Sequence, residues 1–446
     1  MNMNKKIIKK LLTHTGFVRY FKNTTWLMAE QFLRLFSGLL VGIWVARYLG
    51  PEQFGLFSYV IAFTAIFGGV AKLGLDGVVV RELINNSEKE NLYLSTAFWL
   101  KMIGAVVVIL LMLVIVNFSD NDAKTKAFIF IISIGLLFQS FEVVQFYFQS
   151  QVLAKLISIC KIVQLSLSSI IKILLVLNHA DLFWFVCVIT FDAISLAVSY
   201  LIAYRLRTKK LFLERIDFRV ARNLMKDSWP LMFSAIIVMI YTRIDQIMIK
   251  EMLGDHKVGL YSAAVRLSEA TTFIPTLITA SIFPAILNAK KISSKLYNQR
   301  IQSLYTFMVW TAISIALPIT LLSDWLILFL FGEEYRAASA PLMIHIWTAV
   351  FVFLGVAFSK YLITENLTSI SLIRTLCGAI SNVLLNLWLI PGYGITGAAI
   401  ATLIAQFIAN MGYDFIDHRL HDALRVKLLA IVKPWQAFYN IRTQNK

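Results

Sequence analysis

Long apolar blocks separated by short polar segments dominate the hydrophobic pattern of this 446-residue chain. A transmembrane helix needs about 20 consecutive, mainly apolar residues, and about twelve stretches meet that length. Because the apolar residues come in blocks rather than alternating with polar ones, the pattern favours helices over a membrane β-barrel. The predicted spans lie near residues 27–48, 54–74, 92–116, 127–149, 156–177, 182–204, 229–252, 258–287, 303–323, 339–362, 369–390 and 395–416.

The composition supports the same class. Hydrophobic residues make up 59% of the chain and charged residues 15%, and the mean hydropathy is +0.73. Soluble domains average roughly 45–50% apolar and about 25% charged residues. This excess of hydrophobic residues excludes a soluble enzyme and a disordered chain. The three cysteines all lie inside apolar stretches, which excludes a disulfide-rich secreted module. The first apolar stretch contains Glu30 and Arg34 and has no cleavage site, so it is not a signal peptide.

The net charge of +17 predicts the topology rather than a nucleic-acid partner. Lysine and arginine gather in the N-terminal tail, in residues 205–226, in residues 290–300 and at the C-terminus, whereas the alternate loops carry few basic residues. The positive-inside rule therefore predicts a multi-pass protein with both termini in the cytoplasm. Apolar residues between the charges of segment 205–228 suit a linker on the anionic leaflet surface.

The chain also repeats itself. Residues 49–58 and 253–262 share the pattern L-G-x4-G-L-aromatic-S without a gap, and each joins the first two spans of a block of six. An even number of spans per block predicts parallel repeats, an architecture typical of secondary transporters that bind substrate near the bilayer midplane. We therefore expect an N-terminal six-helix lobe with a basic tail (1–204), a linker (205–228), a C-terminal six-helix lobe (229–417) and a cytoplasmic tail (418–446).

Ionisable residues inside the predicted spans are the candidates for function. Each costs about 2.5–3.5 kcal/mol at the bilayer centre, so they must face water or one another. Glu30 shares a helix face with Arg34, four residues away, and Arg266 shares one with Glu269, three residues away. Arg243 and Asp245 are two residues apart and should have separate partners. The other ionisable residues in the spans are Lys101, Glu142, Lys172, Asp192, His345 and Asp414, the last of which should reach the headgroups from a span end.

Arginine at depth suits a phosphate substrate. Its guanidinium stays charged and binds two oxygens at once. Nearby carboxylates either hold the arginines in place when substrate is absent or take up a proton or sodium ion, and the sequence does not choose between these roles. We find no phosphate-binding loop, no catalytic constellation and no metal site, since His418 and His421 lack further ligands.

Several short motifs resemble a known transporter family. They are R-Y-L-G-P-E-Q-F-G at residues 47–55, Arg243-Ile244-Asp245-Gln246, G-L-Y-S-A-A at residues 259–264, Phe331-Gly332-x2-Tyr335 and Gly394-Ile395-x-Gly397-Ala398-Ala399. Together they resemble the polysaccharide transporters of the multidrug/oligosaccharidyl-lipid/polysaccharide exporter superfamily, and within it the O-antigen flippases of the Wzx type. The resemblance implies an all-α fold of two six-helix bundles, arranged in a V around a cationic cavity.

The same resemblance implies a substrate and a site. The substrate would be an undecaprenyl-diphosphate-linked oligosaccharide moved from the cytoplasmic to the periplasmic leaflet by alternating access, with possible H⁺ or Na⁺ coupling and no other cofactor. Expected partners are this lipid, membrane lipids, and the polymerase and chain-length regulator of the pathway, with no nucleic acid. Positions that fit the cationic cavity are Arg34, Lys172, Arg243 and Arg266; Glu30, Glu142, Asp245 and Glu269 would balance these charges or carry the coupling ion.

Two alternatives stay open at this point. A cation-coupled multidrug exporter of the same superfamily would also have twelve spans, but the arginines at mid-depth count against it. A membrane-embedded glycosyltransferase or polymerase of the same pathway would normally have a long periplasmic loop. The longest predicted outside loop, near residues 323–340, is short and apolar.

Overall fold

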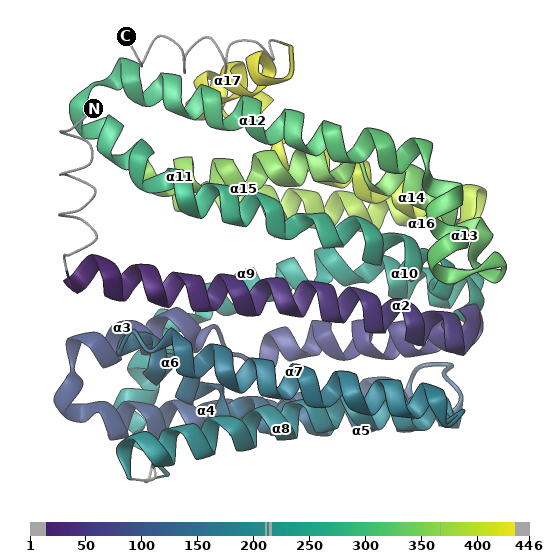
Figure 1. Ribbon diagram of the computed structural model, residues 1–446, viewed down its shortest axis with the longest axis horizontal. Helices are drawn as coiled ribbons and strands as arrows, with labels where there is room; N and C mark the ends of the chain where they lie inside the picture. The colour runs from purple at the N-terminus through teal and green to yellow at the C-terminus, as the bar shows by residue number, and fades with distance from the viewer. Residues whose placement is uncertain (1–14, 210–211, 214–215, 366, 433–446) are drawn as a thin grey trace. The chain divides into compact units, whose positions relative to one another are not determined.

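The computed structural model describes residues 15–209, 212–213, 216–365 and 367–432, and every regular element in these ranges is helical (Figure 1). The all-α class is therefore confirmed. Most of the basic N-terminal tail and the last fourteen residues lie outside the described ranges. The helices are α2 Thr15–Ala71, α3 Leu75–Asn85, η1 Ser87–Lys89, α4 Glu90–Asn117, α5 Ala123–Phe138, η2 Gln139–Glu142, α6 Val143–Ser150, α7 Ala154–Leu177, α8 Leu182–Thr208, α9 Phe218–Leu253, α10 Asp255–Glu269, η3 Ala270–Thr272, α11 Phe273–Ile292, α12 Ser294–Leu321, α13 Ser323–Phe331, η4 Glu333–Ala338, α14 Ser339–His345, α15 Thr348–Thr364, α16 Thr368–Asn410, η5 Gly412–Phe415, η6 His418–Leu420 and α17 His421–Val432.

The described residues contain nine helical stretches long and apolar enough to cross a membrane, or ten if the bent pair Glu333–His345 and Thr348–Leu362 counts as one. Two of them each hold two predicted spans. The backbone leaves the helical conformation at Gly50 in α2 (φ 69°, ψ 169°) and at Gly394 in α16 (φ 59°, ψ −141°). Glycine tolerates a positive φ that other residues rarely adopt. Each long helix therefore divides into two spans, and the chain is a multi-pass membrane protein.

The chain forms two compact units: unit 1 comprises residues 1–45 and 63–236, and unit 2 comprises residues 46–62 and 237–446. In unit 1, buried side chains of α3, α4, α6 and α8 form one core. Phe212, from the predicted linker, is fully buried there, with its ring edge-on to Phe98 (5.7 Å between centroids) and Tyr204 (5.2 Å). Because α9 already begins at Phe218, much of the predicted linker is packed structure.

The core of unit 2 lies among α11, α12, α15 and α17. Figure 1 shows α17, in yellow, beside α12. The Gln302 amide donates to the Val426 carbonyl (3.1 Å) and the Trp310 indole N–H donates to the Ala430 carbonyl (3.2 Å). Residues 421–432 of the predicted cytoplasmic tail therefore form a helix that packs on α12.

The two copies of the repeat meet each other inside unit 2. A Cβ atom on Gly55 would lie 1.8 Å from the carbonyl oxygen of Asp255, and one on Gly259 would lie 1.9 Å from that of Pro51. Pro51 and Asp255 occupy equivalent places in the two copies, and so do Gly55 and Gly259, so the contact is reciprocal. The repeated glycines are explained by this close helix crossing, which leaves no room for a side chain.

Tyr335 of η4 holds the same segment in place. Its hydroxyl donates to the carbonyl oxygen of Ala46 (2.7 Å), and its ring lies 6.3 Å from that of Phe54. Tyr335 is fully buried. The Phe-Gly-x2-Tyr motif thus fixes residues 46–62 within unit 2, and the predicted outside loop near residues 323–340 contains α13 and η4.

Candidate functional site

In unit 1, the predicted pair of Glu30 and Arg34 forms an ion pair within α2, as their spacing predicted. The Glu30 side chain is 5% exposed and that of Arg34 is 48% exposed. The carboxylate is therefore enclosed by the unit, whereas the guanidinium projects beyond it. An arginine held by a buried carboxylate on its own helix keeps its orientation while its remaining N–H groups can reach an anion.

Two further ion pairs cross between helices of unit 1. The Lys101 ammonium of α4 donates to a Glu142 carboxylate oxygen at the end of η2 (2.9 Å), and the Lys101 side chain is 2% exposed. The Lys172 ammonium of α7 lies 3.4 Å from a carboxylate oxygen of Asp192 in α8, and Ser168 bridges them through hydrogen bonds of 2.8 and 2.9 Å. Glu142 and Lys172 therefore have partners outside the set of predicted site residues.

In unit 2, the arginine and the aspartate of the Arg243-Ile244-Asp245 sequence have separate partners, as predicted. The Arg243 guanidinium lies 3.7 Å from a Glu269 carboxylate oxygen, and both side chains are about one-third exposed, at 33% and 38%. Arg266 also interacts electrostatically with Glu269. The structure thus brings Arg243, Arg266 and Glu269 together.

Asp245 is surrounded by neutral groups. It is 5% exposed and accepts hydrogen bonds from the Tyr261 hydroxyl (2.7 Å), the Asn386 amide (2.6 Å) and the Thr402 hydroxyl. The Asn386 amide also donates to the side-chain oxygen of Asn382 (3.3 Å). No cationic side chain forms an ion pair with Asp245 in the described part of the chain. The Asp245 carboxylate is therefore stabilised only by neutral hydroxyl and amide donors.

The two arms of α16 supply most of these donors. Asn382 and Asn386 lie on one face before the Gly394 kink, and Thr402 follows it. A Cβ on Gly397 would lie 2.2 Å from the Leu389 carbonyl oxygen, so the glycine lets the two arms pack closely. The Asn386 side-chain oxygen is buried and accepts no hydrogen bond within the described structure. The site therefore contains the Asp245 carboxylate and, on Asn386, an amide oxygen that can still accept a hydrogen bond.

A cavity of about 350 Å³ in unit 2 opens beside this cluster. Its lining includes Asp245, Tyr261, Glu269, His345, Thr402 and Gln406. The buried His345 ring shares a hydrogen bond of 2.9 Å with the Ser268 hydroxyl, in keeping with a structural imidazole. The cavity thus connects the carboxylate of the Arg243–Glu269 pair with that of the Asp245 cluster.

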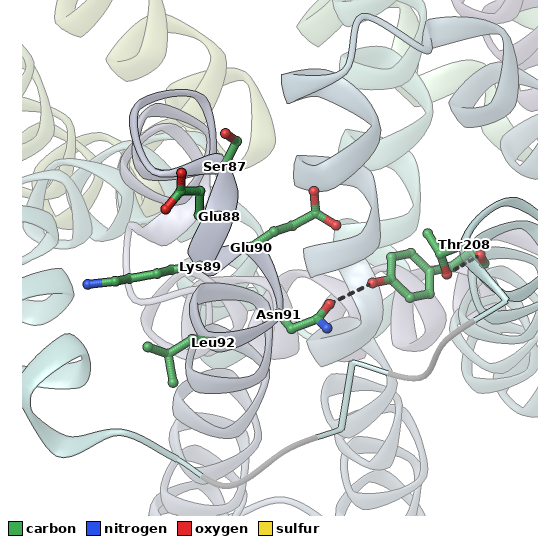
Figure 2. Close-up of a pocket in the computed structure, with 8 residues that line it drawn as sticks. Ser87, Glu88, Lys89, Glu90, Asn91, Leu92 and Thr208 are labelled. Atoms are coloured by element: carbon green, nitrogen blue, oxygen red, sulfur yellow. Dashed lines mark hydrogen bonds between the residues drawn. The ribbon is translucent and has the colours of Figure 1, made fainter.

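A second cavity, of about 570 Å³, lies in unit 1 where η1 and the first turn of α4 face the end of α8 (Figure 2). Residues 87–92, Tyr204 and Thr208 line it, and the Tyr204 hydroxyl donates to the Asn91 side-chain oxygen (3.4 Å). None of the predicted site residues lines this cavity, and we assign it no role.

Sequence reasoning missed part of the site. The two asparagines of the stretch Asn382-Val-Leu-Leu-Asn386 stand four apart in an apolar helix, and that spacing could have revealed them. The expectation that Asp414 reaches the headgroups is wrong. Its side chain is fully buried and bonded to Lys427 of α17, because the chain folds back onto unit 2 after the last span.

Comparison with known sequence families identifies two matching models. The model described as "Polysaccharide biosynthesis protein" matches residues 20–290, which is more than half of the chain. The model named MatE matches residues 230–388. The first match covers most of unit 1 together with α9, α10 and most of α11, and the second includes Asp245 and both asparagines but ends within α16.

Curated relatives cover most of the chain. The chain is 25% identical over 420 residues to the capsular polysaccharide biosynthesis protein CapF of Staphylococcus aureus, which covers 90% of this chain and 99% of that protein. It is 26% identical over 375 residues to the probable low-salt glycan biosynthesis flippase Agl15 of Haloferax volcanii, covering 81% and 75%.

Among solved structures, the lipid II flippase MurJ in its inward closed conformation is similar. The TM-score is 0.67 and the sequence identity is 16%, and the match covers 92% of this chain and 91% of MurJ. At this identity the likeness shows a shared fold. It agrees with the fold predicted from the repeat and the apolar blocks.

Proposed function

The chain belongs to the polysaccharide biosynthesis protein family, and on that premise we propose that it is a flippase for lipid-linked oligosaccharides. At the level of the family and its neighbours it is a transporter rather than an enzyme. The finer proposal is that it moves an undecaprenyl-diphosphate-linked, O-antigen-type repeat unit from the cytoplasmic to the periplasmic leaflet of the inner membrane, by alternating access. Both termini then lie in the cytoplasm.

Arg34 carries this proposal. It is a guanidinium inside a membrane span, 48% exposed, and its carboxylate partner lies on the same helix. A permanently charged group at this depth is costly unless it faces water or an anion. Arg243 of unit 2 is also partly exposed beside Glu269. We propose that both arginines bind the acidic head of the substrate, with Lys172 and Arg266 adding positive charge, while the lipid tail stays in the bilayer.

We further propose that the Asp245 cluster takes up the coupling ion, which would make the protein an antiporter. A hard cation such as Na⁺ prefers oxygen ligands. Asp245, the side-chain oxygens of Asn382 and Asn386, and the Thr402 hydroxyl would hold it, and the unfilled acceptor on Asn386 supports this fit. A proton on Asp245 would neutralise the same charge. Glu30, Glu142 and Glu269 would then balance the basic residues.

The test is complementation in a strain whose own O-antigen flippase gene is deleted. We expect R34A and R243A to lower surface polysaccharide by about ten- to a hundredfold, the range that corresponds to losing a charge-assisted hydrogen bond of about 1.5–3 kcal/mol. D245N should abolish the response to a cation gradient. The control is R419A, which removes an exposed arginine that pairs with Asp417. The proposal fails if membrane levels hold and R34A and R243A both export normally.

A multidrug exporter is the second candidate, because the MatE model matches residues 230–388. Such a protein would raise resistance of the host to cationic drugs. If expression of the wild-type chain protects cells from such drugs and fails to restore surface polysaccharide, the exporter replaces the flippase.

A further inference from the structure

Two lysines of unit 1, Lys72 and Lys161, belong to no sequence motif and form no ion pair among the described residues. Lys72 directly follows α2, Lys161 lies in the second turn of α7, and both side chains are partly exposed. In the described part of the chain neither ammonium takes part in an ion pair or a hydrogen bond. Both are therefore available to bind an anion.

The register of α2 against α7 places Lys161 beside the Glu30–Arg34 pair. The Asn23 side-chain oxygen accepts from the Ala154 backbone N–H (2.6 Å), and the hydroxyls of Ser37 and Ser169 lie 2.7 Å apart. These two contacts are about four helical turns apart in each helix, so the helices run side by side in parallel. Lys161 and Glu30 each lie about 10 Å along their helix from the first contact, which puts them at the same level.

Electrostatic interactions join these residues into one group, which we call the unit 1 basic cluster. Lys161 interacts with Arg34, Glu30, Glu142 and Lys72, and Glu142 also interacts with Lys101. The members of the unit 1 basic cluster are Glu30, Arg34, Lys72, Lys101, Glu142 and Lys161.

The charges of this cluster do not balance. Glu30 is paired with Arg34, and Glu142 is paired with Lys101. Lys72 and Lys161 form no such pair, so the cluster carries two more positive than negative charges. Unpaired charge within a membrane protein is costly, and an anion with two adjacent negative groups would remove most of that cost.

We propose that Lys161 and Lys72, next to Arg34, form a binding site for a diphosphate ester. This inference deepens the proposed flippase function, because it assigns the diphosphate of the lipid-linked substrate to unit 1. Each ammonium can contact one phosphate group as a point charge, while the Arg34 fork binds two oxygens. A monophosphate would leave one lysine without a phosphate contact, so the site should prefer a diphosphate.

The experiment measures binding of farnesyl diphosphate, farnesyl monophosphate and inorganic pyrophosphate to the purified full-length protein in detergent. We expect wild-type protein to bind farnesyl diphosphate at least tenfold more tightly than the monophosphate. K161Q should weaken diphosphate binding about tenfold, and K161Q/K72Q about a hundredfold, with a smaller salt dependence. The matched control is K155Q, which removes an exposed lysine of the same helix that lies over the Trp26 ring.

The outcomes separate this inference from the proposed function. Wild-type binding that K161Q and K72Q leave unchanged overturns the lysine site and leaves the flippase standing. Equal wild-type binding of pyrophosphate and farnesyl diphosphate indicates a free diphosphate rather than a lipid, which counts against the flippase. Wild-type protein that binds neither diphosphate contradicts both.

A second measurement does not depend on the folding of a variant. In wild-type protein, farnesyl diphosphate should slow reductive methylation of Lys161 and Lys72, read by mass spectrometry, and should leave that of Lys155 unchanged. Equal methylation of Lys161 with and without the ligand overturns the proposal.

Discussion

Two groups of charged residues, one in each unit, have the same kind of imbalance but differ in access. The unit 1 basic cluster has four cations and two carboxylates, and its Arg34 is 48% exposed. In unit 2, Arg374 and Lys427 share one carboxylate, Asp414, and the side chains of Lys427 and Asp414 are fully buried. We call this second group the sealed cluster. Both clusters have excess positive charge, so access to that charge is what distinguishes the proposed binding site from the sealed cluster.

The sealed cluster is closed by the protein itself. The Lys427 ammonium donates to the Asn410 carbonyl (2.8 Å) and lies 3.5 Å from the centre of the Phe358 ring, and the Arg374 guanidinium lies 4.4 Å from the same ring. An aromatic face attracts cations that have lost their water. The excess positive charge of the sealed cluster is thus stabilised by the Asn410 carbonyl and the Phe358 ring. Among the described residues, no such contact stabilises the excess charge of the unit 1 basic cluster, which in our proposal leaves it to bind an anion.

The largest effect should come from removing a charge of the sealed cluster. We expect D414N to destabilise the protein by about 3–5 kcal/mol, because removing the carboxylate leaves its buried cations without compensation, and K427A to cost less, because Arg374 still pairs with Asp414. D414N should be the worse of the two, since it leaves both cations without a carboxylate. The measurement is thermal unfolding in detergent, with diphosphate binding followed in parallel at a temperature where the variants stay folded.

The exposed Arg419, which pairs with Asp417, provides the control, because R419A should change stability by less than about 1 kcal/mol. The comparison is broken if K427A weakens diphosphate binding and leaves the melting temperature unchanged. The sealed cluster would then belong with the binding residues.

The glycine crossing tests a feature that the two repeats share. G55A and G259A each place a methyl group less than 2 Å from a backbone carbonyl oxygen. We expect each to cost about 1–3 kcal/mol, the usual range for overpacking, and the two costs to be similar because the contact is reciprocal. The control is G77A in α3, where a Cβ meets no atom within 4 Å. The melting temperatures of the three variants test this prediction. A large decrease for G55A or G259A with none for the other would contradict a reciprocal contact.

These residues show what the sequence could and could not predict. Apolar blocks predicted the spans because lipid imposes both length and composition. The Glu30–Arg34 pair followed from helical spacing, since both residues lie on one helix. Asn382 and Asn386 could have been found from their spacing on one helix, whereas Lys161 escaped because its neighbours lie on other helices, at a register that only packing reveals. Asp414 was misjudged for the same reason, because its partner Lys427 belongs to a helix within the predicted cytoplasmic tail.

The smallest expected effect is a pH dependence of α17 docking. Lys427 lies outside the membrane spans, and burial together with the nearby Arg374 lowers its pKa to about 7, although Asp414 opposes this shift. Docked α17 therefore binds fewer protons than undocked α17 between pH 7 and the ordinary lysine pKa of about 10.4. Raising the pH through this window should favour docking, by at most about tenfold per unit for one proton. Below pH 7 the lysine is charged in both the docked and the undocked state. Docking is therefore weakest there and does not change with pH.

Hydrogen exchange of the α17 amides, normalised to the intrinsic exchange rate at each pH, measures this equilibrium. Protection of α17 relative to α12 should rise between pH 7 and 9 in the wild-type protein. In K427M the rise should disappear, because the titrating group is gone, even though the variant is less stable overall. A rise that persists in K427M would assign the titration to another group. Lys427 would then stay charged in the docked state. The sealed cluster would differ from the unit 1 basic cluster only in being buried.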